Sequence, residues 1–159
     1  MKRIMGVVGL YFIIGFCSVY ANDAIEGYWR SMDDRSGEPL SIIEFKKQSN
    51  GKYTGTIIHR YKSVRGTQLE NCEKCPEPFK GKPLLGLQII WDLEKDPNKP
   101  NNYIKGRLVE PRTGNIYNGR GNLASDGRKL YMRGYIGVSV LGRTQVWLRV
   151  NDLAAEIAK

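Results

Sequence analysis

The sequence predicts an all-β fold, in which eight antiparallel strands follow one another around an up-and-down barrel, with a short helix at the C-terminus. Three observations favour this architecture. β-Branched and aromatic residues recur in short runs. The runs are separated by Gly, Asn, Asp and Pro residues typical of turns. Eight sequential antiparallel strands can close on themselves, which removes exposed sheet edges. A two-sheet sandwich is the alternative that these patterns leave open.

The N-terminus has the three-part layout of a secretory signal peptide. Lys2 and Arg3 precede an uncharged apolar run over residues 4–16, and Val19, Tyr20 and Ala21 form the third part. We expect cleavage after Ala21, which assigns residues 1–21 to the signal peptide and residues 22–159 to a single domain. An uncleaved membrane anchor is the weaker alternative, because the run is shorter than the ~20 residues that span a bilayer. The sequence therefore predicts a periplasmic or secreted protein.

Each run after the signal peptide is bounded by turn residues. The short connections contain the Asn, Asp and Gly that hairpin turns require, so consecutive strands are expected to be antiparallel neighbours. The predicted strands are residues 27–32, 40–47, 52–61, 84–93, 103–110, 115–124, 129–136 and 143–150.

Two connections are longer than a hairpin turn. Residues 62–83 and 94–102 contain prolines that cannot continue a strand, and we expect both loops to line the mouth of the barrel. The last nine residues predict a short helix that Asn151 or Asp152 caps, with a narrow apolar stripe. The stripe includes Leu153, Ala154 and Ile157.

The charge balance restricts the partners. The chain has 25 Lys and Arg against 16 Asp and Glu, a formal net charge of +9, and the charges are interspersed. In an exported protein, such a surface suits anionic envelope components better than nucleic acid, and we predict no nucleic-acid partner. A basic surface that only keeps the protein soluble is an equally simple interpretation. The oligomeric state is left open.

Several motifs resemble a known family. Gly27 and Trp29 in the first strand, with Arg149 near the end of the last, resemble the calycin superfamily, which contains the lipocalins. The segments GYWRS, GKPLLGLQIIWDL, PRTGNIY and LYMRGYIGVSVLGRTQVWLRV occur in the order found in an exported bacterial family, domain of unknown function 2147, and are similar to it. The resemblance covers essentially all of residues 22–159. It implies a lipocalin-like barrel outside the cytoplasm, without an established activity.

Physical reasons support a structural role for the three calycin-like residues. Glycine permits the chain to pass close beneath the end of the barrel, and an indole is large enough to plug that end. Arg149 is expected to lay its guanidinium on the Trp29 ring, a cation–π contact worth ~1 kcal/mol. We therefore predict that Gly27, Trp29 and Arg149 form the floor of the barrel.

The last strand has two candidate inner faces. Alternation places Arg143, Gln145, Trp147 and Arg149 on one face and aliphatic residues on the other. Hydrophobicity alone would turn the aliphatic face inward, whereas contact between Arg149 and Trp29 requires the polar face inward. We favour the polar face inward, with the apolar stripe of the C-terminal helix covering the aliphatic face.

The candidate ligand-binding residues lie near this strand. Arg143 and Gln145 are on the last strand, Arg133 and Tyr135 are on the preceding one, and their side chains are expected to converge near one rim; Tyr117 is a weaker candidate. Arginine can bind a carboxylate or phosphate while aromatic walls hold an apolar tail. For Arg133, pairing on the outer surface is the alternative. The prediction is a small amphipathic, anionic ligand such as a fatty acid or lipid fragment.

The two cysteines outside the signal peptide are separated by two residues. In an oxidising compartment, Cys72 and Cys75 are expected to form a short-loop disulfide. Zinc requires about four ligands, and the sequence offers neither a second cysteine pair nor a histidine cluster, so no metal and no cofactor are predicted. A thioredoxin-type redox pair is disfavoured, because prolines follow in a loop of an all-β chain.

Nothing in the sequence marks a catalytic constellation. His59 is the single histidine and lies in a strand, and no strained G-x-S-x-G turn presents a serine. A ligand-binding barrel is therefore the leading hypothesis. The second is a cavity-free, envelope-associated interaction protein that acts through its basic surface and the Cys-containing loop. An enzyme is the third.

Overall fold

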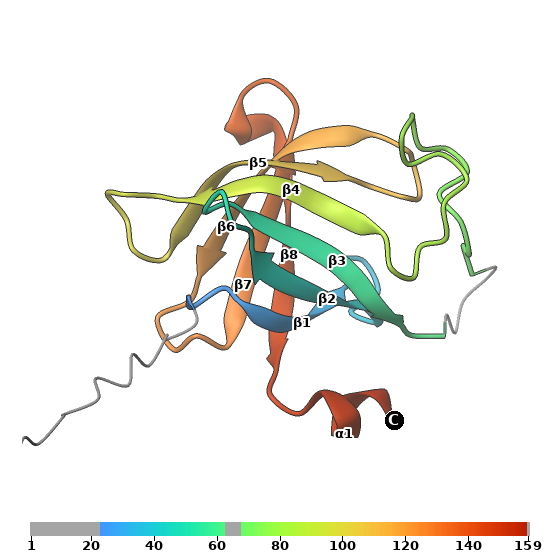
Figure 1. Ribbon diagram of the computed structural model, residues 1–159, viewed down its shortest axis with the longest axis horizontal. Helices are drawn as coiled ribbons and strands as arrows, with labels where there is room; N and C mark the ends of the chain where they lie inside the picture. The colour runs from blue at the N-terminus through green and yellow to red at the C-terminus, as the bar shows by residue number, and fades with distance from the viewer. Residues whose placement is uncertain (1–22, 63–67, 159) are drawn as a thin grey trace, which may run out of the picture.

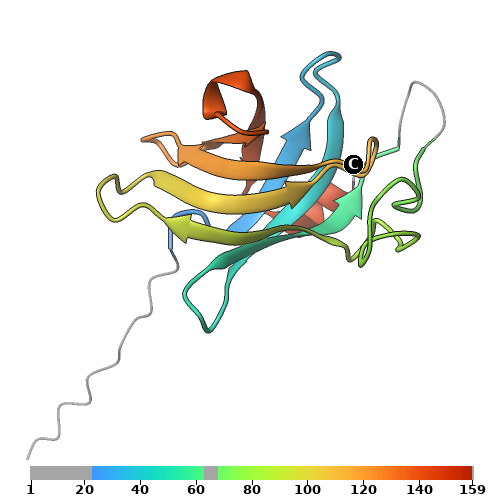
Figure 2. The ribbon, with the colours of Figure 1, turned by 90° about the horizontal axis from the view of Figure 1, so that it is seen from above.

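The chain forms a closed barrel of eight antiparallel strands, in the computed structural model that describes residues 23–62 and 68–158 (Figure 1). Each strand pairs with its neighbours in the sequence, and β1 pairs with β8 to close the barrel. Figure 2 shows the strands curving around a common interior. The strands are β1 (Gly27–Met32), β2 (Pro39–Lys47), β3 (Tyr53–Arg60), β4 (Gln88–Lys95), β5 (Asn102–Val109), β6 (Ile116–Leu123), β7 (Lys129–Tyr135) and β8 (Gly142–Val150). The predicted barrel is confirmed, and the predicted signal peptide lies outside the described residues.

The strand bounds agree with the sequence prediction to within one residue at each end, except in β4. This strand begins four residues later than predicted, because Leu84 and Leu87 are buried in a tight turn in which the Leu87 amide donates to the Leu84 carbonyl (3.1 Å). Buried leucines give the same sequence pattern in a turn as in a strand. Farther along β4, Asp92 has a φ of 56°, which interrupts the regular alternation.

One end of the barrel, here called the floor, is closed by Trp29 and Arg149. The guanidinium lies 4.1 Å from the centroid of the indole ring. It also donates to the carbonyls of Glu26 (3.1 Å), Gly127 (2.7 Å) and Ala24. The positive φ of Gly27 (107°) favours glycine where the chain passes this guanidinium. The floor therefore has the arrangement that the sequence leads us to expect.

A polar cluster ties the N-terminal residues to the floor. The Asp23 carboxylate accepts hydrogen bonds from the hydroxyls of Tyr53 (2.6 Å) and Tyr103 (3.0 Å) and from Lys95 (3.1 Å). Burial opposes its ionisation, but these hydrogen bonds outweigh burial and lower the pKa of Asp23 to about 2. Between the cluster and Trp29, Ile25 is fully buried, and its carbonyl accepts from the Trp29 indole (2.8 Å). Residues 23–26 thus cover the closed end of the barrel.

The opposite end, here called the mouth, receives every other connection. Since β1 runs from the floor to the mouth, the β1–β2, β3–β4, β5–β6 and β7–β8 connections lie at the mouth, and the other three lie at the floor. The prediction that residues 62–83 line the mouth agrees with this order for residues 62 and 68–83, and residues 63–67 lie outside the described residues. The same prediction for residues 94–102 is wrong, because the β4–β5 turn returns the chain at the floor.

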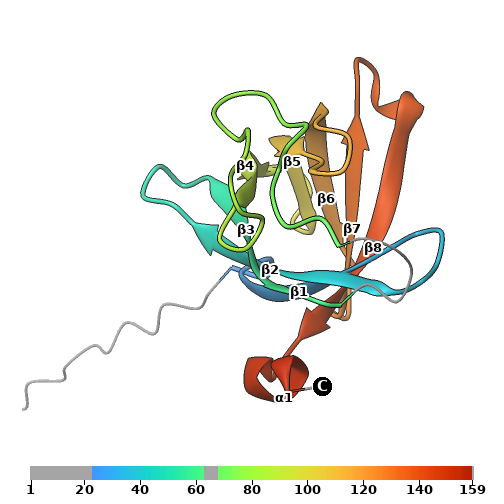
Figure 3. The same ribbon diagram turned by 90° about the vertical axis from the view of Figure 1, so that its right-hand side faces the viewer.

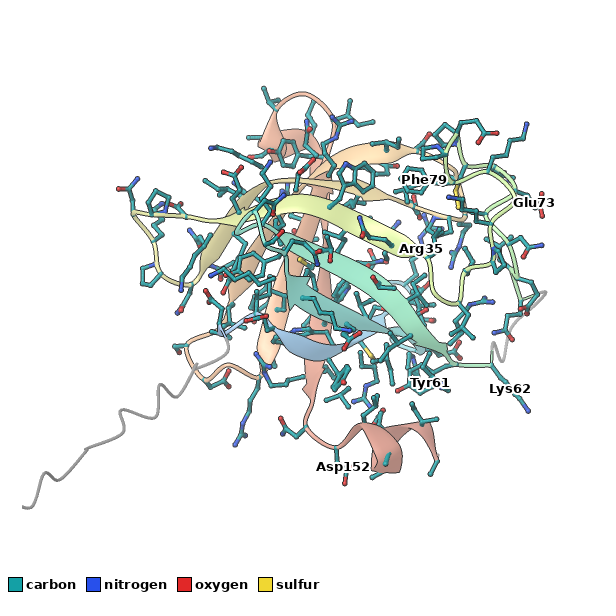
Figure 4. All side chains as sticks on the ribbon, in the orientation of Figure 1. Arg35, Tyr61, Lys62, Glu73, Phe79 and Asp152 are labelled. Carbon is teal, nitrogen blue, oxygen red and sulfur yellow. A yellow bond between two sulfur atoms is a disulfide. The ribbon has the colours of Figure 1, made fainter. Side chains whose placement is uncertain are left out.

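The described part of the β3–β4 loop is fastened by the predicted disulfide between Cys72 and Cys75, both of which are buried. The loop docks on the β5–β6 turn at Gly114, where a Cβ atom would lie 1.9 Å from the Lys74 carbonyl oxygen. Phe79 packs on Trp91 of β4, with 5.2 Å between ring centroids. Figure 4 shows Phe79 on this loop, which lies beside the mouth. The disulfide thus supports a loop that is packed on the barrel.

The C-terminal helix α1 (Leu153–Ile157) is present, and the Asp152 side chain caps it by accepting from the Ala155 amide (3.0 Å). Its docking differs from the prediction. Glu156 is the buried helix residue, and its carboxylate accepts from Arg30 (2.6 Å) and from the Tyr61 hydroxyl (2.6 Å). Burial and this hydrogen bond raise the pKa of Tyr61 to about 12.

The predicted apolar stripe does not hold α1 on the barrel. Ile157 is 44% exposed and Ala154 is exposed, so the prediction that the stripe covers the outer face of the last strand is wrong. The polar contacts of Glu156 determine how α1 docks on the barrel more than the apolar stripe does, because a buried carboxylate requires partners. Within the described residues, no helix is long and apolar enough to span a bilayer.

Gly114 provides a test of the loop docking. Gly114→Ala should destabilise the protein by about 2 kcal/mol more than Gly51→Ala, because both positions have a similar left-handed φ (78° and 81°) and only Gly114 faces backbone. The left-handed conformation alone costs an alanine roughly 1 kcal/mol. Urea unfolding of the two variants measures the difference. Equal losses of stability would show that the loop does not pack against this turn.

Asp23 should make stability depend on acid pH. Its folded pKa of about 2 lies below the ordinary 3.8, so its contribution is complete above about pH 4 and is lost as the pH falls through 2. Asp23→Asn should therefore lower the free energy of unfolding by about 2 kcal/mol at pH 7 and by much less at pH 2. Urea unfolding between pH 2 and 7 tests this, with Glu73→Gln on an exposed loop as the control. A loss that is equal at both pH values would contradict the assignment.

Candidate functional site

A cavity of about 940 Å³ opens at the mouth of the barrel. Its inner part is apolar, formed by inward-facing side chains of six strands. These include Ile43, Ile57, Ile90, Leu108, Met132 and Trp147. Figure 3 looks toward the side of the molecule on which the β3–β4 loop lies. The loop contributes Leu69 and Leu84 to the lining, so it forms one wall of the cavity.

The base of the cavity is formed around Trp147, which is buried and packs near Phe45, with 6.1 Å between ring centroids. Its indole nitrogen donates to the side-chain oxygen of Gln145, one step closer to the mouth (3.1 Å). Arg143 follows on the same face, whereas Val146 is turned outward and is 37% exposed. The polar face of β8 is therefore the inner face, as the contact between Arg149 and Trp29 requires.

The rim of the cavity is charged. Arg143 forms an ion pair with Asp34, Arg112 pairs with Asp33 (3.5 Å), and both acids belong to the β1–β2 turn. The hydrogen bond from Arg143 holds the pKa of Asp34 below its ordinary value. Hydrogen bonds from the amides of Arg35 and Ser36 do the same for Asp33. These pairs fix the turn over the mouth.

Three further cations line the cavity. Arg60 pairs with Glu70 across 3.3 Å. Arg35 and Lys74 are exposed, and neither has a carboxylate partner among residues 23–62 and 68–158. The sequence pattern did not identify any of the three as a site residue. Strand order would have placed Arg35 and Arg60 at the mouth, but no local pattern distinguishes Lys74 from other loop lysines.

The predicted ligand-binding residues divide into two groups. Arg143, Gln145 and Tyr117 line the cavity. Arg133 and Tyr135 do not, and the prediction that they converge with Arg143 and Gln145 is wrong. Met132 pairs with Gln145 and faces inward, so its neighbours on β7 face outward. Arg133 instead donates to the hydroxyl of Thr144 on the outer surface (2.8 Å).

Comparison with known proteins adds the family. Residues 27–149 match the model of a bacterial family described as "Uncharacterized protein conserved in bacteria (DUF2147)". The chain belongs to this family. The match begins at Gly27 and ends at Arg149, so it contains both ends of the floor contact and the whole cavity, but neither Asp23 nor α1. A search of curated proteins gives no match.

A solved structure supports the fold of this DUF2147 protein. Protein HP1028 from Helicobacter pylori, described as belonging to the lipocalin family, aligns with a TM-score of 0.67 and 22% sequence identity. The alignment covers 82% of this chain and 86% of HP1028. At that identity, the similarity establishes a lipocalin-like barrel and leaves the ligand to be argued from the cavity itself.

The described residues of the DUF2147 barrel do not assemble a metal site. No group of three or more His, Cys, Asp or Glu side chains within residues 23–62 and 68–158 has a metal-binding arrangement. His59 packs against the Tyr61 ring (5.0 Å between centroids). Asp33 and Asp34 are held in separate ion pairs with arginines. The arrangement suits binding of a molecule with an apolar tail and a polar head.

Proposed function

We propose that this DUF2147 protein acts in the periplasm or outside the cell and binds a small amphipathic, anionic molecule such as a fatty acid or lipid fragment. The observation that supports this function most strongly is the cavity of about 940 Å³, apolar at its base and charged at its rim. Ligand pockets for small molecules typically enclose about 300–1,000 Å³. The volume is therefore sufficient for an acyl chain.

The division of the lining gives the orientation of the ligand. An acyl chain that displaces water from Met132, Trp147 and their neighbours gains the hydrophobic free energy of burial, roughly 25 cal/mol for each Å². A charged head cannot enter that region without a partner, because an unpaired buried charge is strongly disfavoured. The head therefore stays at the rim, beside Arg35, Lys74 and Arg143.

The rim favours an anionic head over a cationic one. Asp33 and Asp34 already have arginine partners, whereas Arg35 and Lys74 have no carboxylate partner in the described part of the chain. A carboxylate or phosphate head would also compete with Asp34 for Arg143. The alternative hypothesis requires a barrel without a cavity, whereas a cavity of about 940 Å³ opens into this barrel.

Charge variants at the rim test the orientation. Arg143→Gln should weaken binding of dodecanoate roughly three- to fivefold, as for a partly exposed charge pair. Asp34→Asn should strengthen it, because Arg143 loses its competing partner. Displacement of a fluorescent fatty-acid analogue by dodecanoate gives both affinities.

Dodecanol is the matched ligand control, because it has the same chain without the charge, and the two variants should not change its affinity. Arg107→Gln, on the outer face of β5, is the control variant. Failure of dodecanoate to displace the analogue from the unaltered protein would refute the binding function. Displacement that neither rim variant alters would refute the proposed position of the head.

A further inference from the structure

The β7–β8 connection presents aliphatic side chains to solvent. This connection, here called the hairpin tip, consists of residues 136–141. Ile136 is 62% exposed, Val138 64%, Val140 83% and Leu141 77%. It projects from the barrel at the upper end of β7 and β8 in Figure 1. Single exposed aliphatic residues are common, but four in six residues of one turn are typical of an interaction site.

The hairpin tip is held in this exposed arrangement by Arg133. The guanidinium donates to the carbonyls of Ser139 (2.8 Å) and Val140 (3.0 Å), within the short helix η1 (Ser139–Leu141). It also donates to the Thr144 hydroxyl on β8 (2.8 Å). These bonds join the tip to both strands of the hairpin, so the aliphatic side chains are fixed outward by a specific set of contacts.

The outer faces of β6 and β7 carry two arginines behind the hairpin tip. Arg120 and Arg133 are direct neighbours across β6 and β7, facing outward. Neither pairs with a carboxylate within the described residues. Adjacent like charges repel, so this surface favours an anionic partner.

We propose that the hairpin tip inserts into the interface of an anionic lipid bilayer, with Arg120 and Arg133 beside the head groups. A projecting turn of aliphatic residues matches the acyl boundary of a bilayer, and basic residues behind it match anionic head groups. This interaction does not depend on the proposed ligand.

Membrane docking would also orient the cavity. Leu141 belongs to the hairpin tip and lines the cavity mouth. Insertion of the tip therefore brings the opening of the barrel next to the bilayer surface. The sequence leads to the hypothesis of an envelope-associated protein that acts through its basic surface and the Cys-containing loop. The hairpin tip is a different element for such an interaction.

An environment-sensitive dye on the tip tests the insertion. Val140→Cys is labelled with a nitrobenzoxadiazole dye and mixed with vesicles of phosphatidylcholine and phosphatidylglycerol at a molar ratio of about 3:1. The emission maximum of the dye should shift to the blue, and the emission should become brighter. The same dye on Ser49→Cys, in the β2–β3 turn at the floor, should not respond. Vesicles of phosphatidylcholine alone should give a much smaller change, and high salt should reverse the change, because surface charge pairing is screened.

Unlabelled variants separate the two contributions in vesicle co-sedimentation. Val138→Ser with Val140→Ser should weaken binding at least roughly tenfold through lost apolar burial. Arg120→Gln should weaken it roughly fivefold, whereas Lys99→Gln at the floor should not. Unchanged thermal midpoints establish that these exposed substitutions leave the fold intact.

Three outcomes would overturn the proposal. The first is that anionic vesicles leave the emission of the dye on Val140→Cys unchanged. The second is an equal response from the dye at Ser49. The third is a dye response without vesicles that grows with protein concentration, which would identify a second copy of the chain as the partner.

Discussion

The contact between Arg149 and Trp29 is the constraint on which the rest of the structure depends. The two residues are register partners on β1 and β8, the strands that close the barrel, and the guanidinium also binds carbonyls of residues 24, 26 and 127. Burial lowers the pKa of Arg149, and the indole face and the three carbonyls compensate for its lost hydration. Because Arg149 must point inward, every second residue of β8 does so as well. The cavity is consequently left at the other end.

The same alternation gives one hairpin two surfaces. On the inner side of β7 and β8, Met132, Gln145 and Trp147 form the base and wall of the cavity. On the outer side, Arg133 holds the hairpin tip. Trp29 and Arg149 close the floor, and the sheet is continuous around the barrel, so the mouth can stay open without an exposed sheet edge. The apolar lining, the charged rim and the aliphatic tip are thus free to serve binding.

The sequence predicted the barrel well because its signals are local. Turn residues delimit the strands, and Gly27, Trp29 and Arg149 identify the floor. The errors concern properties that depend on the whole barrel. Arg133 and Tyr135 were assigned to the cavity because they lie on the strand adjacent to that of Arg143 and Gln145, but the register between the strands puts them on the outer face. Glu156 was overlooked because its partners, Arg30 and Tyr61, lie about a hundred residues away in the chain. Unpaired cations at the rim can be recognised only when the neighbouring acids are placed.

The central claim is that the barrel interior is an accessible binding cavity. Beginning at Asn22, the chain contains two methionines: Met132 lines the cavity, whereas Met32 is absent from its lining. When the methionine methyl groups are labelled with ¹³C, the NMR spectrum contains one methyl signal from the cavity, that of Met132, and one from outside it, that of Met32. Both signals can be followed during a titration with dodecanoate. The account predicts a saturable shift of the Met132 methyl and an unchanged Met32 methyl. An unchanged Met132 methyl at saturating dodecanoate would contradict it.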